Sequence, residues 1–445
     1  MKKKLMVLGM SAAIVMGGVF LPSSDGMANA VQAASEGIHS QSEGKIAKKF
    51  NENRAYQTIY HLSETIGPRV TGTQAEKKSA AFIASQMKKS NLKVSTQTFS
   101  IPDRLEGTLT VRGNELPARP ASGSAPTSDK GLTAPLYDAG LGLPGDFTEE
   151  AKGKIAVILR GDLSFYEKAK NAENAGAAGV IIYNNVDSLV PLTPNLSGNT
   201  TGIPVVGVKK EDGENLLTEQ EATLKLKSFP NQTSQNVIGV RKAKGVKHPD
   251  IVYVTSHYDS VPEAPGANDN ASGTSVVLEL ARITKNIPAD KEIRFITFGA
   301  EEIGLVGSRY YVSKLSNREI ERSTANFNLD MVGTSWENAS QLYINTPDGS
   351  ENLIWQLSKN AATSIGKNVL SLRKGGSSDH VPFYEAGIDS ANFIWMEPGT
   401  ESLEPWYHTP FDTIEHISKD RLKTAGQIAG TAVYDLVEKE ERRAQ

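Results

Sequence analysis

Between residues 250 and 440, short apolar runs alternate with longer segments of helical periodicity. The apolar runs lie at 250–257, 291–298, 324–329 and 390–396, and the helical patterns at 273–285, 351–366 and 419–441. Several runs are apolar at consecutive positions, which is typical of strands that helices cover on both faces. The pattern predicts a three-layer α/β/α domain on a mostly parallel mixed sheet.

Further elements of this domain are predicted nearer the N-terminus. Residues 54–67 show helical periodicity that stops at Gly67-Pro68, a pair that ends helices. A second helix is predicted after Thr73, which would cap it while Glu76 completes a capping box. Residues 92–101 then alternate as a strand.

The pattern changes between residues 103 and 235. Residues 117–131, PARPASGSAPTSDKG, predict a linker or a long loop because Pro, Gly and Ser dominate them. Short β runs around one Ala-rich helix follow, which indicates a compact α/β unit, and a strand of the main domain resumes at 236–242. We divide the chain into a signal segment, a first part of the main domain, an inserted domain and a second part of the main domain, at 1–33, 34–104, 105–233 and 234–445.

The signal segment is assigned from the first residues of the chain. Lys2, Lys3 and Lys4 precede the apolar run LMVLGMSAAIVMGGVFL, and Ala-x-Ala-like sites end at Ala30 and Ala33. This order is typical of a secretory signal peptide. A membrane anchor is the alternative, but the run is short for a span and glycines interrupt it. We expect cleavage and a secreted protein without membrane attachment.

Composition narrows the chemistry further. The 48 Lys and Arg residues against 51 Asp and Glu residues give a net charge of −3, which offers no electrostatic basis for binding nucleic acid or an anionic membrane. The chain has no cysteine, so disulfides and thiolate metal sites are excluded. Any bound metal must be held by His, Asp and Glu.

Ionisable residues follow the ends of four predicted strands. Ligands gather at the carboxyl ends of strands in open α/β sheets, so we expect these side chains to meet at one edge. Clustered carboxylates repel one another unless a cation lies among them, and imidazole with carboxylate suits zinc. The residues concerned are His257, Asp259, Asp269, Glu301, Glu302, Asp330, Tyr407 and His408.

A charge count favours two metal ions. Asp269, Glu302 and Asp330 carry three negative charges, and the two histidines are neutral as ligands. One divalent ion would leave this set at minus one, whereas two ions with a bridging hydroxide bring it to zero. One aspartate can also bridge two ions, so the number of ligands fits the same interpretation.

Six segments in this order resemble the motifs of the M28 zinc aminopeptidases. They are SHYDS, GANDNASGT, FGAEEIGLVGS, NLDMVG, GGSSDHVPF and WYHTPFDT. The resemblance covers residues 45–102 and 235–440 and implies a zinc-exopeptidase fold. The region containing GKIAVILRGDLSFYEKAKNAENAGAAGVIIYNN is similar to a protease-associated (PA) domain, which some members of the family carry as an insertion.

The resemblance implies the ligands of two zinc ions. They would be His257 and Asp330 for one ion, Glu302 and His408 for the other, and Asp269 between both.

Roles for three further residues are implied in the same way. Glu301 would be the general base that takes a proton from a zinc-bridging water. Asp259 would accept the second ring N–H of His257 and so fix its orientation. Tyr407 would stabilise the oxyanion of the tetrahedral intermediate.

Other ionisable residues are not assigned to the metal site. Asp379 and His380 lie in a segment that the resemblance places near the substrate, but a structural role is equally open. Arg69 is expected to form a structural ion pair. The remaining histidines are expected to be ordinary surface or packing residues: His39, His61, His248 and His416.

The predicted function is a secreted metallo-aminopeptidase. It would act as a monomer with two Zn²⁺ ions and remove the N-terminal residue, leucine-type or basic, from peptides with a free N-terminus. A carboxypeptidase or dipeptidase of the same fold is the main alternative. Glutaminyl cyclisation with one zinc fits the five ligands less well, and a non-catalytic binding protein would not need Glu301 and Tyr407.

Overall fold

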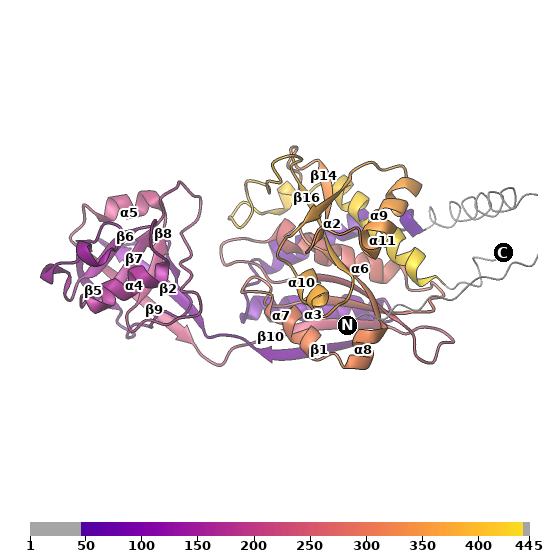
Figure 1. Cartoon of the computed structure of the whole chain (residues 1–445), viewed down its shortest axis with the longest axis horizontal. Helices are drawn as coiled ribbons and strands as arrows, with labels where there is room; N and C mark the ends of the chain where they lie inside the picture. The colour runs from indigo at the N-terminus through magenta and orange to yellow at the C-terminus, as the bar shows by residue number, and fades with distance from the viewer. Residues whose placement is uncertain (1–45, 439–445) are drawn as a thin grey trace, which may run out of the picture.

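The computed structural model describes residues 46–438, which form two lobes joined by a two-stranded ribbon (Figure 1). The signal segment predicted at residues 1–33 lies outside these residues. Within residues 46–438 no helix is both long enough and apolar enough to cross a membrane.

The larger lobe is built on an eight-stranded mixed sheet. Its four central strands run parallel to one another. In spatial order the strands are β1 (Lys93–Ser100), β10 (Thr233–Arg241), β12 (Glu292–Phe298), β11 (Ile251–His257), β13 (Ser323–Leu329), β16 (Ser390–Met396), β14 (Gln341–Thr346) and β15 (Leu370–Lys374). The hydrophobic pattern predicted all of these strands except β14 and β15.

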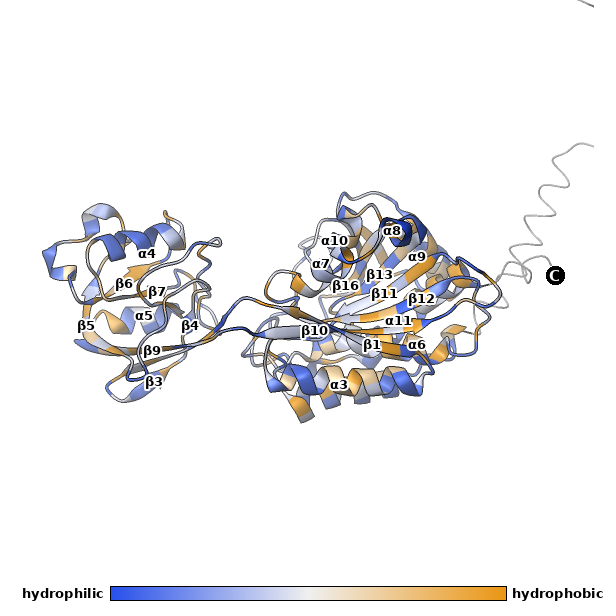
Figure 2. Ribbon diagram, turned by 90° about the horizontal axis from the view of Figure 1, so that it is seen from below, coloured by the Kyte–Doolittle hydropathy of each residue, from blue (hydrophilic) through white to orange (hydrophobic). Residues whose placement is uncertain are grey.

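Helices cover both faces of this sheet. Because successive residues of a strand point to opposite sides, each central strand contributes side chains to two cores. Val252 and Val254 of β11 pack into one core, and Ile251 and Tyr253 pack into another. Figure 2 shows the apolar strands between the two helical layers. The first core takes α2 (Glu52–Tyr60), α3 (Gln74–Lys89), α6 (Gly273–Ile283), α9 (Leu353–Ser364) and α11 (Lys419–Val437), and the second takes α7 (Val306–Ser313), α8 (Asn317–Arg322) and α10 (His380–Glu385). The predicted three-layer arrangement is confirmed.

The start of α3 is predicted correctly, but its capping box is only half formed. Thr73 Oγ1 accepts the hydrogen bond of Glu76 N at 3.3 Å. The carboxylate of Glu76 accepts from Gly72 N at 2.7 Å and from the hydroxyl of Ser234, rather than from Thr73 N. The second half of the predicted box is therefore wrong, because β10 brings Ser234 to this buried carboxylate.

The smaller lobe is the insertion between β1 and β10, and it has its own sheet and cores. The predicted linker at residues 117–131 lies inside this lobe, because β4 within it pairs with β8. The domain limits at residues 105 and 233 stay a prediction. The elements are β2 (Arg104–Val111), β3 (Asn114–Leu116), β4 (Arg119–Pro120), β5 (Leu132–Asp138), β6 (Ile155–Leu159), α4 (Phe165–Asn174), β7 (Gly179–Tyr183), β8 (Val205–Val208), α5 (Lys210–Leu216) and β9 (Glu221–Phe229).

Strand directions decide which edge of the main sheet faces the insertion. β1 is antiparallel to β10, and β10 is antiparallel to β12. β1 therefore runs in the same direction as β11, β12, β13 and β16. The chain leaves β1 for the insertion at the edge where these four strands end.

Candidate active site

Asp269 lies at the centre of the site, and each of its carboxylate oxygens faces a different imidazole. Oδ1 lies 3.3 Å from Nε2 of His257, and Oδ2 lies 2.9 Å from Nε2 of His408. His257 is the last residue of β11 and is buried, while His408 lies in the loop between β16 and α11. A carboxylate in this position can ligate two cations at once.

Each imidazole also faces a second carboxylate. Asp330 Oδ1 lies 3.3 Å from Nε2 of His257, and Glu302 Oε2 lies 3.2 Å from Nε2 of His408. The structure thus brings together all five side chains predicted as metal ligands, although they are spread over about 150 residues of the chain.

The donor set fits a divalent metal centre. Glu302 Oε1, Asp330 Oδ1 and His408 Nε2 are buried without a hydrogen-bond partner among the described residues. Burial, together with the charge of Asp269, raises the pKa of the Glu302 carboxyl to about 7. A cation among these atoms would satisfy them and relieve the repulsion. Imidazole and carboxylate donors without thiolate suit zinc in particular.

Glu301 lies beside the ligands without facing Asp269. One set of ligand atoms within 4.8 Å of one another belongs to His257, Glu301 and Asp330. Burial raises the pKa of the Glu301 carboxyl well above its usual range, and the charges of Asp379 and Glu302 raise it further, while His257 opposes them. A carboxylate with a raised pKa accepts a proton readily near neutral pH.

Asp259 contacts the backbone of the two glutamates more closely than it contacts His257. Its Oδ1 accepts from Glu301 N at 3.1 Å, and its Oδ2 accepts from Thr71 Oγ1 at 2.8 Å and from Glu302 N at 3.3 Å. The distance from Oδ1 to His257 Nδ1 is 3.6 Å, which exceeds a hydrogen bond. The carboxylate of Asp259 therefore positions the glutamate segment, while Nδ1 of His257 lies 3.3 Å from the main-chain oxygen of Asp259 and not within hydrogen-bond distance of the predicted carboxylate.

Side chains that the sequence analysis did not identify hold the loop around Asp269. The Asp412 carboxylate accepts from Asn268 N at 2.7 Å and from Asp269 N at 3.0 Å. The side chain of Asn268 donates to Glu404 at 3.0 Å and accepts from Gly333 N at 2.8 Å. These bonds join the segments that carry Asp269, Asp330 and His408. Asp412 was present in the motif WYHTPFDT, but nothing in the motif revealed its partner.

Two further polar residues hold neighbouring ligand segments. Ser378 donates to Asp330 Oδ2 at 2.7 Å and accepts from Asn328 Nδ2 at 2.9 Å. Asn270 accepts from Gly273 N at 2.8 Å and donates to the carbonyl of Leu329 at 2.9 Å. Ser378 belongs to the motif GGSSDHVPF and Asn328 to the motif NLDMVG, but neither motif by itself shows that the two side chains meet.

Tyr407 lies directly beside His408, one of the predicted ligands. Its ring stacks on that of His408 with a centroid distance of 3.8 Å, and 37% of its surface is exposed. Burial raises the pKa of its hydroxyl, and the carboxylates of Asp269 and Glu302 raise it further. The phenol therefore stays protonated at neutral pH and can donate a hydrogen bond to substrate.

Asp379 and His380 are neighbours in the chain, but their side chains have different electrostatic surroundings. Burial raises the pKa of Asp379 to about 7, His257 opposes this, and Asp259 adds to it, so Asp379 belongs electrostatically to the carboxylate cluster. His380 is also buried, and burial lowers its pKa to about 4. It is neutral near pH 7 and packs at the start of α10.

The predicted ion pair of Arg69 is wrong. The guanidinium is fully buried and donates only to main-chain carbonyls, with no ion pair to a described carboxylate. Its acceptors include Tyr258 at 2.6 Å, Gly266 at 2.7 Å and Pro265. Arg69 therefore fixes both ends of the segment between His257 and the loop of Asp269.

The other histidines lie away from the ligand cluster. His61 packs against Phe82 with tilted rings whose centroids are 4.2 Å apart, and His416 stacks on Trp406 at 4.0 Å. His248 is exposed. The expectation of packing or surface roles is confirmed for these three, while His39 lies outside the described residues.

Comparison with known proteins agrees with this geometry. Residues 236–433 match the profile of Peptidase family M28, and residues 130–216 match that of the PA domain. The chain is 63% identical to Aminopeptidase YwaD of Bacillus subtilis over 443 residues, or 99% of this chain and 96% of that protein. It is 30% identical to Leucine aminopeptidase 2 of Arthroderma otae, over 82% of this chain and 79% of that protein.

Solved structures show the same relationship. The structure of BSAP, a zinc aminopeptidase from Bacillus subtilis, has a TM-score of 0.83 and 67% sequence identity, and covers 88% of this chain and 96% of that chain. An aminopeptidase from an Aneurinibacillus strain has a TM-score of 0.69 and 38% identity, over 89% and 96%. With these relatives, this fold and this ligand cluster, the chain belongs to peptidase family M28, a family of hydrolases, and carries an inserted PA domain as its motifs predicted.

Proposed function

We propose that the chain is a secreted zinc aminopeptidase that removes the N-terminal residue, leucine-type or basic, from peptides and aminoacyl amides. The observation that carries this proposal is Asp269 with one imidazole on each carboxylate oxygen. The printed descriptions of the related proteins, an aminopeptidase and a zinc aminopeptidase, support it.

Two zinc ions fit the five ligands. When bound, they would supply Lewis-acid chemistry that polarises the substrate carbonyl and acidifies water. His257 and Asp330 would hold one ion, Glu302 and His408 the other, and Asp269 both.

The chain's own residues would move the proton and stabilise the developing charge. Glu301 takes a proton from the attacking water and returns it to the leaving amine, for which its raised pKa is suited. Tyr407 donates its hydroxyl proton in a hydrogen bond to the carbonyl oxygen as negative charge develops there. Asp259 holds the backbone of Glu301 so that its carboxylate keeps this position.

Excess carboxylate in the site explains a preference for a free N-terminus. The α-amine of a peptide is largely positive near neutral pH, and the charges of Asp379 and Asp330 act on the carboxylate of Glu301. Pairing with the amine would place the first carbonyl over the ligands. An acetylated amine would leave a carboxylate desolvated and unpaired, at a cost of about 1–3 kcal/mol or more.

The test compares leucyl peptides with a free amine and the same peptides acetylated. We expect release of one residue at a time from the free peptides, almost none from the acetylated ones, and loss of activity with a chelator that zinc reverses. Release of the C-terminal residue first would indicate a carboxypeptidase. Cleavage of two-residue substrates alone would indicate a dipeptidase.

The metal assignment is tested separately by metal analysis. His257→Ala and His408→Ala should each lower bound zinc by about one ion per chain, because each removes a ligand of a different ion. Full zinc content in both variants would contradict the ligand assignment, whatever the activity.

Secretion is tested at the N-terminus of the mature protein. We expect the protein in the culture medium to begin at Ala34 after loss of residues 1–33, or at Val31 after cleavage behind Ala30. A cell-associated protein that retains Lys2 to Lys4 would contradict the signal-peptide assignment.

A further inference from the structure

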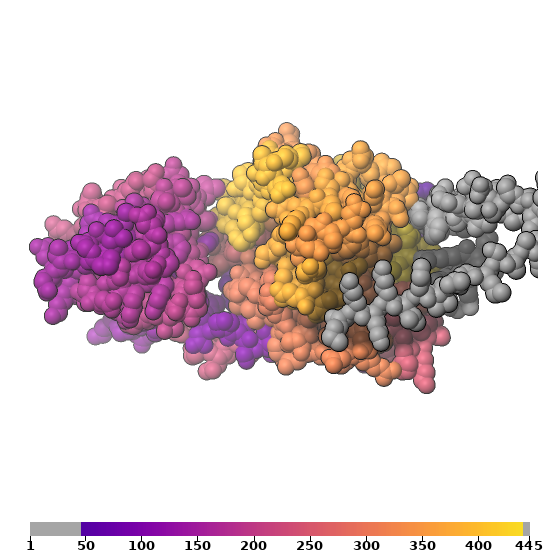
Figure 3. All heavy atoms as spheres, viewed as in Figure 1, coloured from indigo at the N-terminus to yellow at the C-terminus, as the bar shows by residue number. Residues whose placement is uncertain are grey.

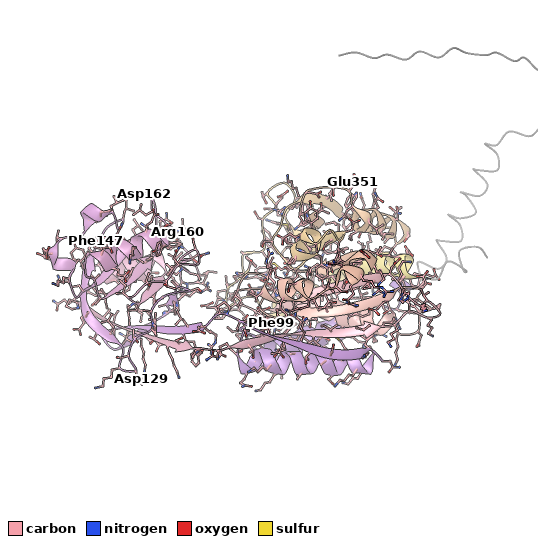
Figure 4. The ribbon with its side chains drawn as sticks, turned by 60° about the horizontal axis from the view of Figure 1, so that its bottom comes forward. Phe99, Asp129, Phe147, Arg160, Asp162 and Glu351 are labelled. Atoms are coloured by element: carbon pink, nitrogen blue, oxygen red, sulfur yellow. The ribbon has the colours of Figure 1, made fainter. Side chains whose placement is uncertain are left out.

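The insertion is attached beside the active site. The ribbon leaves the main sheet at the edge where the strands carrying the ligands end, as the strand directions require. Phe99 and Ile101 at the base of the ribbon pack with Ala300, the residue before Glu301. Figure 4 labels Phe99 at this junction between the lobes.

The space-filling view shows the consequence for access. The insertion faces the end of the larger lobe that carries the yellow C-terminal loop, across a furrow (Figure 3). The loop contains Tyr407 and His408. This edge of the larger lobe therefore faces the insertion, and the later residues of a bound peptide would run toward it.

One ion pair connects the two lobes outside the ribbon. Arg119 of β4 donates through Nε to Glu263 Oε1 at 2.8 Å and through Nη2 to Glu263 Oε2. Arg119 also donates to Thr193 Oγ1 at 2.7 Å, which fixes it within the insertion. Within residues 46–438, no other hydrogen bond or ion pair outside the ribbon joins the two lobes.

Glu263 belongs to the segment between two of the metal ligands. That segment runs from His257 to Asp269, and Arg69 fixes it by binding the carbonyls of Tyr258 and Gly266. The ion pair therefore attaches the insertion to a rigid part of the active site. Its paired geometry makes it stronger than a single contact, although both side chains stay partly exposed.

A cavity of about 740 Å³ lies beside this pair. Its walls come from both lobes: β2, β4 and β9 of the insertion contribute Gly107, Arg119 and Lys227, and the larger lobe contributes Pro262 and Glu263. The pair thus sets how closely the lobes approach and how wide the space between them is.

We propose that Arg119, through its pair with Glu263, determines the length of substrate that the enzyme accepts. The closed pair holds the insertion over the exit of the substrate chain. It leaves short amides unaffected and restricts long peptides, whose later residues must pass between the lobes. This inference rests on the proposed aminopeptidase function, and it makes Arg119 a residue of specificity rather than of catalysis.

The test compares kcat/KM for leucine p-nitroanilide and for a leucyl peptide of about twelve residues, which is about 40 Å long when extended. In Arg119→Ala, the value for the long peptide should rise by up to about fivefold, the factor expected from loss of a partly exposed pair. The value for the amide should stay unchanged. Arg119→Glu should act like Arg119→Ala, and Glu263→Arg added to it should restore the original ratio.

Arg112→Ala is the matched control, because Arg112 pairs with Glu219 inside the insertion at 2.6 Å. It should change neither rate. Small-angle scattering should show a larger radius of gyration for Arg119→Ala than for the parent and for Arg112→Ala. An unchanged or lower ratio of the two rates in Arg119→Ala, or identical scattering of the three proteins, would overturn the proposal. Absence of amide hydrolysis in the parent would instead overturn the proposed function. The scattering would still show whether the pair of Arg119 with Glu263 holds the two lobes together.

Discussion

At the scale of single residues, the site concentrates negative charge that the protein alone does not neutralise. Asp269, Glu302 and Asp330 surround two imidazoles, and buried atoms of Glu302 and Asp330 lack partners among the described residues. The negative charges of Asp269 and Glu302 raise the pKa of His408 to about 10 against the effect of burial. Such a set stores electrostatic repulsion that a bound cation removes.

Glu301→Gln is predicted to separate proton transfer from metal binding. Glutamine keeps the size and polarity of the side chain but cannot accept a proton. We expect normal zinc content and a loss of kcat of at least about 10²-fold, the usual scale for a positioned acid–base group. Glu302→Gln is the control, since it should lower zinc content as well. Turnover of Glu301→Gln at the rate of the parent would exclude Glu301 as the base.

Asp412→Asn is predicted to weaken metal binding without touching a ligand side chain. Each oxygen of the carboxylate accepts a hydrogen bond from one backbone N–H group, that of Asn268 or that of Asp269. In asparagine an NH2 group replaces one of these oxygens, so one backbone N–H group faces another donor and loses its hydrogen bond. Loss of such a support lowers metal affinity by about 10- to 100-fold. Competition with a chelator measures the zinc dissociation constant. The exposed Asp420→Asn should leave it unchanged, and equal constants in both variants would contradict the role of Asp412.

At the scale of elements, the predicted ligands lie in or beside tight turns, most of which follow the strands. Ala300, Met331 and His408 have φ angles of 59°, 59° and 57°, a left-handed conformation that costs about 1–3 kcal/mol for a non-glycine residue at such a site. At Gly273, which begins α6, a Cβ atom would lie 2.0 Å from the carbonyl oxygen of Leu329. The turns bearing Asp269 and Asp330 therefore approach each other closely only because this position is glycine.

The beginning of α3 is predicted to make stability depend on pH. Burial raises the pKa of Glu76 from 4.5 to about 8, and the charge of Asp259 adds to this. The folded protein thus holds a proton that the unfolded chain releases between these two values. The free energy of unfolding should fall by on the order of a few kcal/mol as pH rises through this window.

Glu76→Gln should remove this dependence, because an amide cannot ionise, and it can accept from Gly72 N through its oxygen while its NH2 group donates to the hydroxyl oxygen of Ser234. Urea unfolding of the zinc-saturated proteins at about pH 5 and about pH 8 measures the difference. Glu351→Gln, at an exposed position labelled in Figure 4, is the control and should behave like the parent. A Glu76→Gln variant that loses as much stability as the parent would contradict the assignment.

At the scale of the whole molecule, the insertion behaves as a separate unit placed over one edge of the sheet. Its cores contain only its own residues, while the ribbon and the pair of Arg119 with Glu263 connect it to the larger lobe. The predicted metal ligands all come from the larger lobe. The insertion is therefore expected to influence access and not the chemical step.

Replacing residues 105–233 with a short Gly/Ser linker tests this expectation. The strand ends that remain, in β1 and β10, pair directly, with Phe99 opposite Ser234, so a short linker can join them. We expect similar kcat on leucine amides and a changed KM, or a changed range of lengths, on peptides. Identical kinetics on short and long peptides would exclude a role of the insertion in access.

The sequence by itself determined the elements and the chemistry. Hydrophobic periodicity is a local property, so it located the central strands, and the order of six motifs identified His257, Asp269, Glu302, Asp330 and His408 as one set. The pattern missed β14 because this short strand carries polar residues at Gln341, Asn345 and Thr346 although it is mostly buried. It missed β15 because this strand lies at the edge of the sheet and is only partly buried, which weakens the apolar signal.

Only the tertiary structure decided which polar groups meet. Asp412 binds the backbone of Asp269 across more than 140 residues, Arg69 takes carbonyls instead of a carboxylate, and Arg119 reaches Glu263 from another lobe. A hydrogen bond depends on distance in space, and the fold brings these loops together through strand order and direction. No local pattern encodes that proximity, so the residues that hold the ligands in place became visible only in the folded chain.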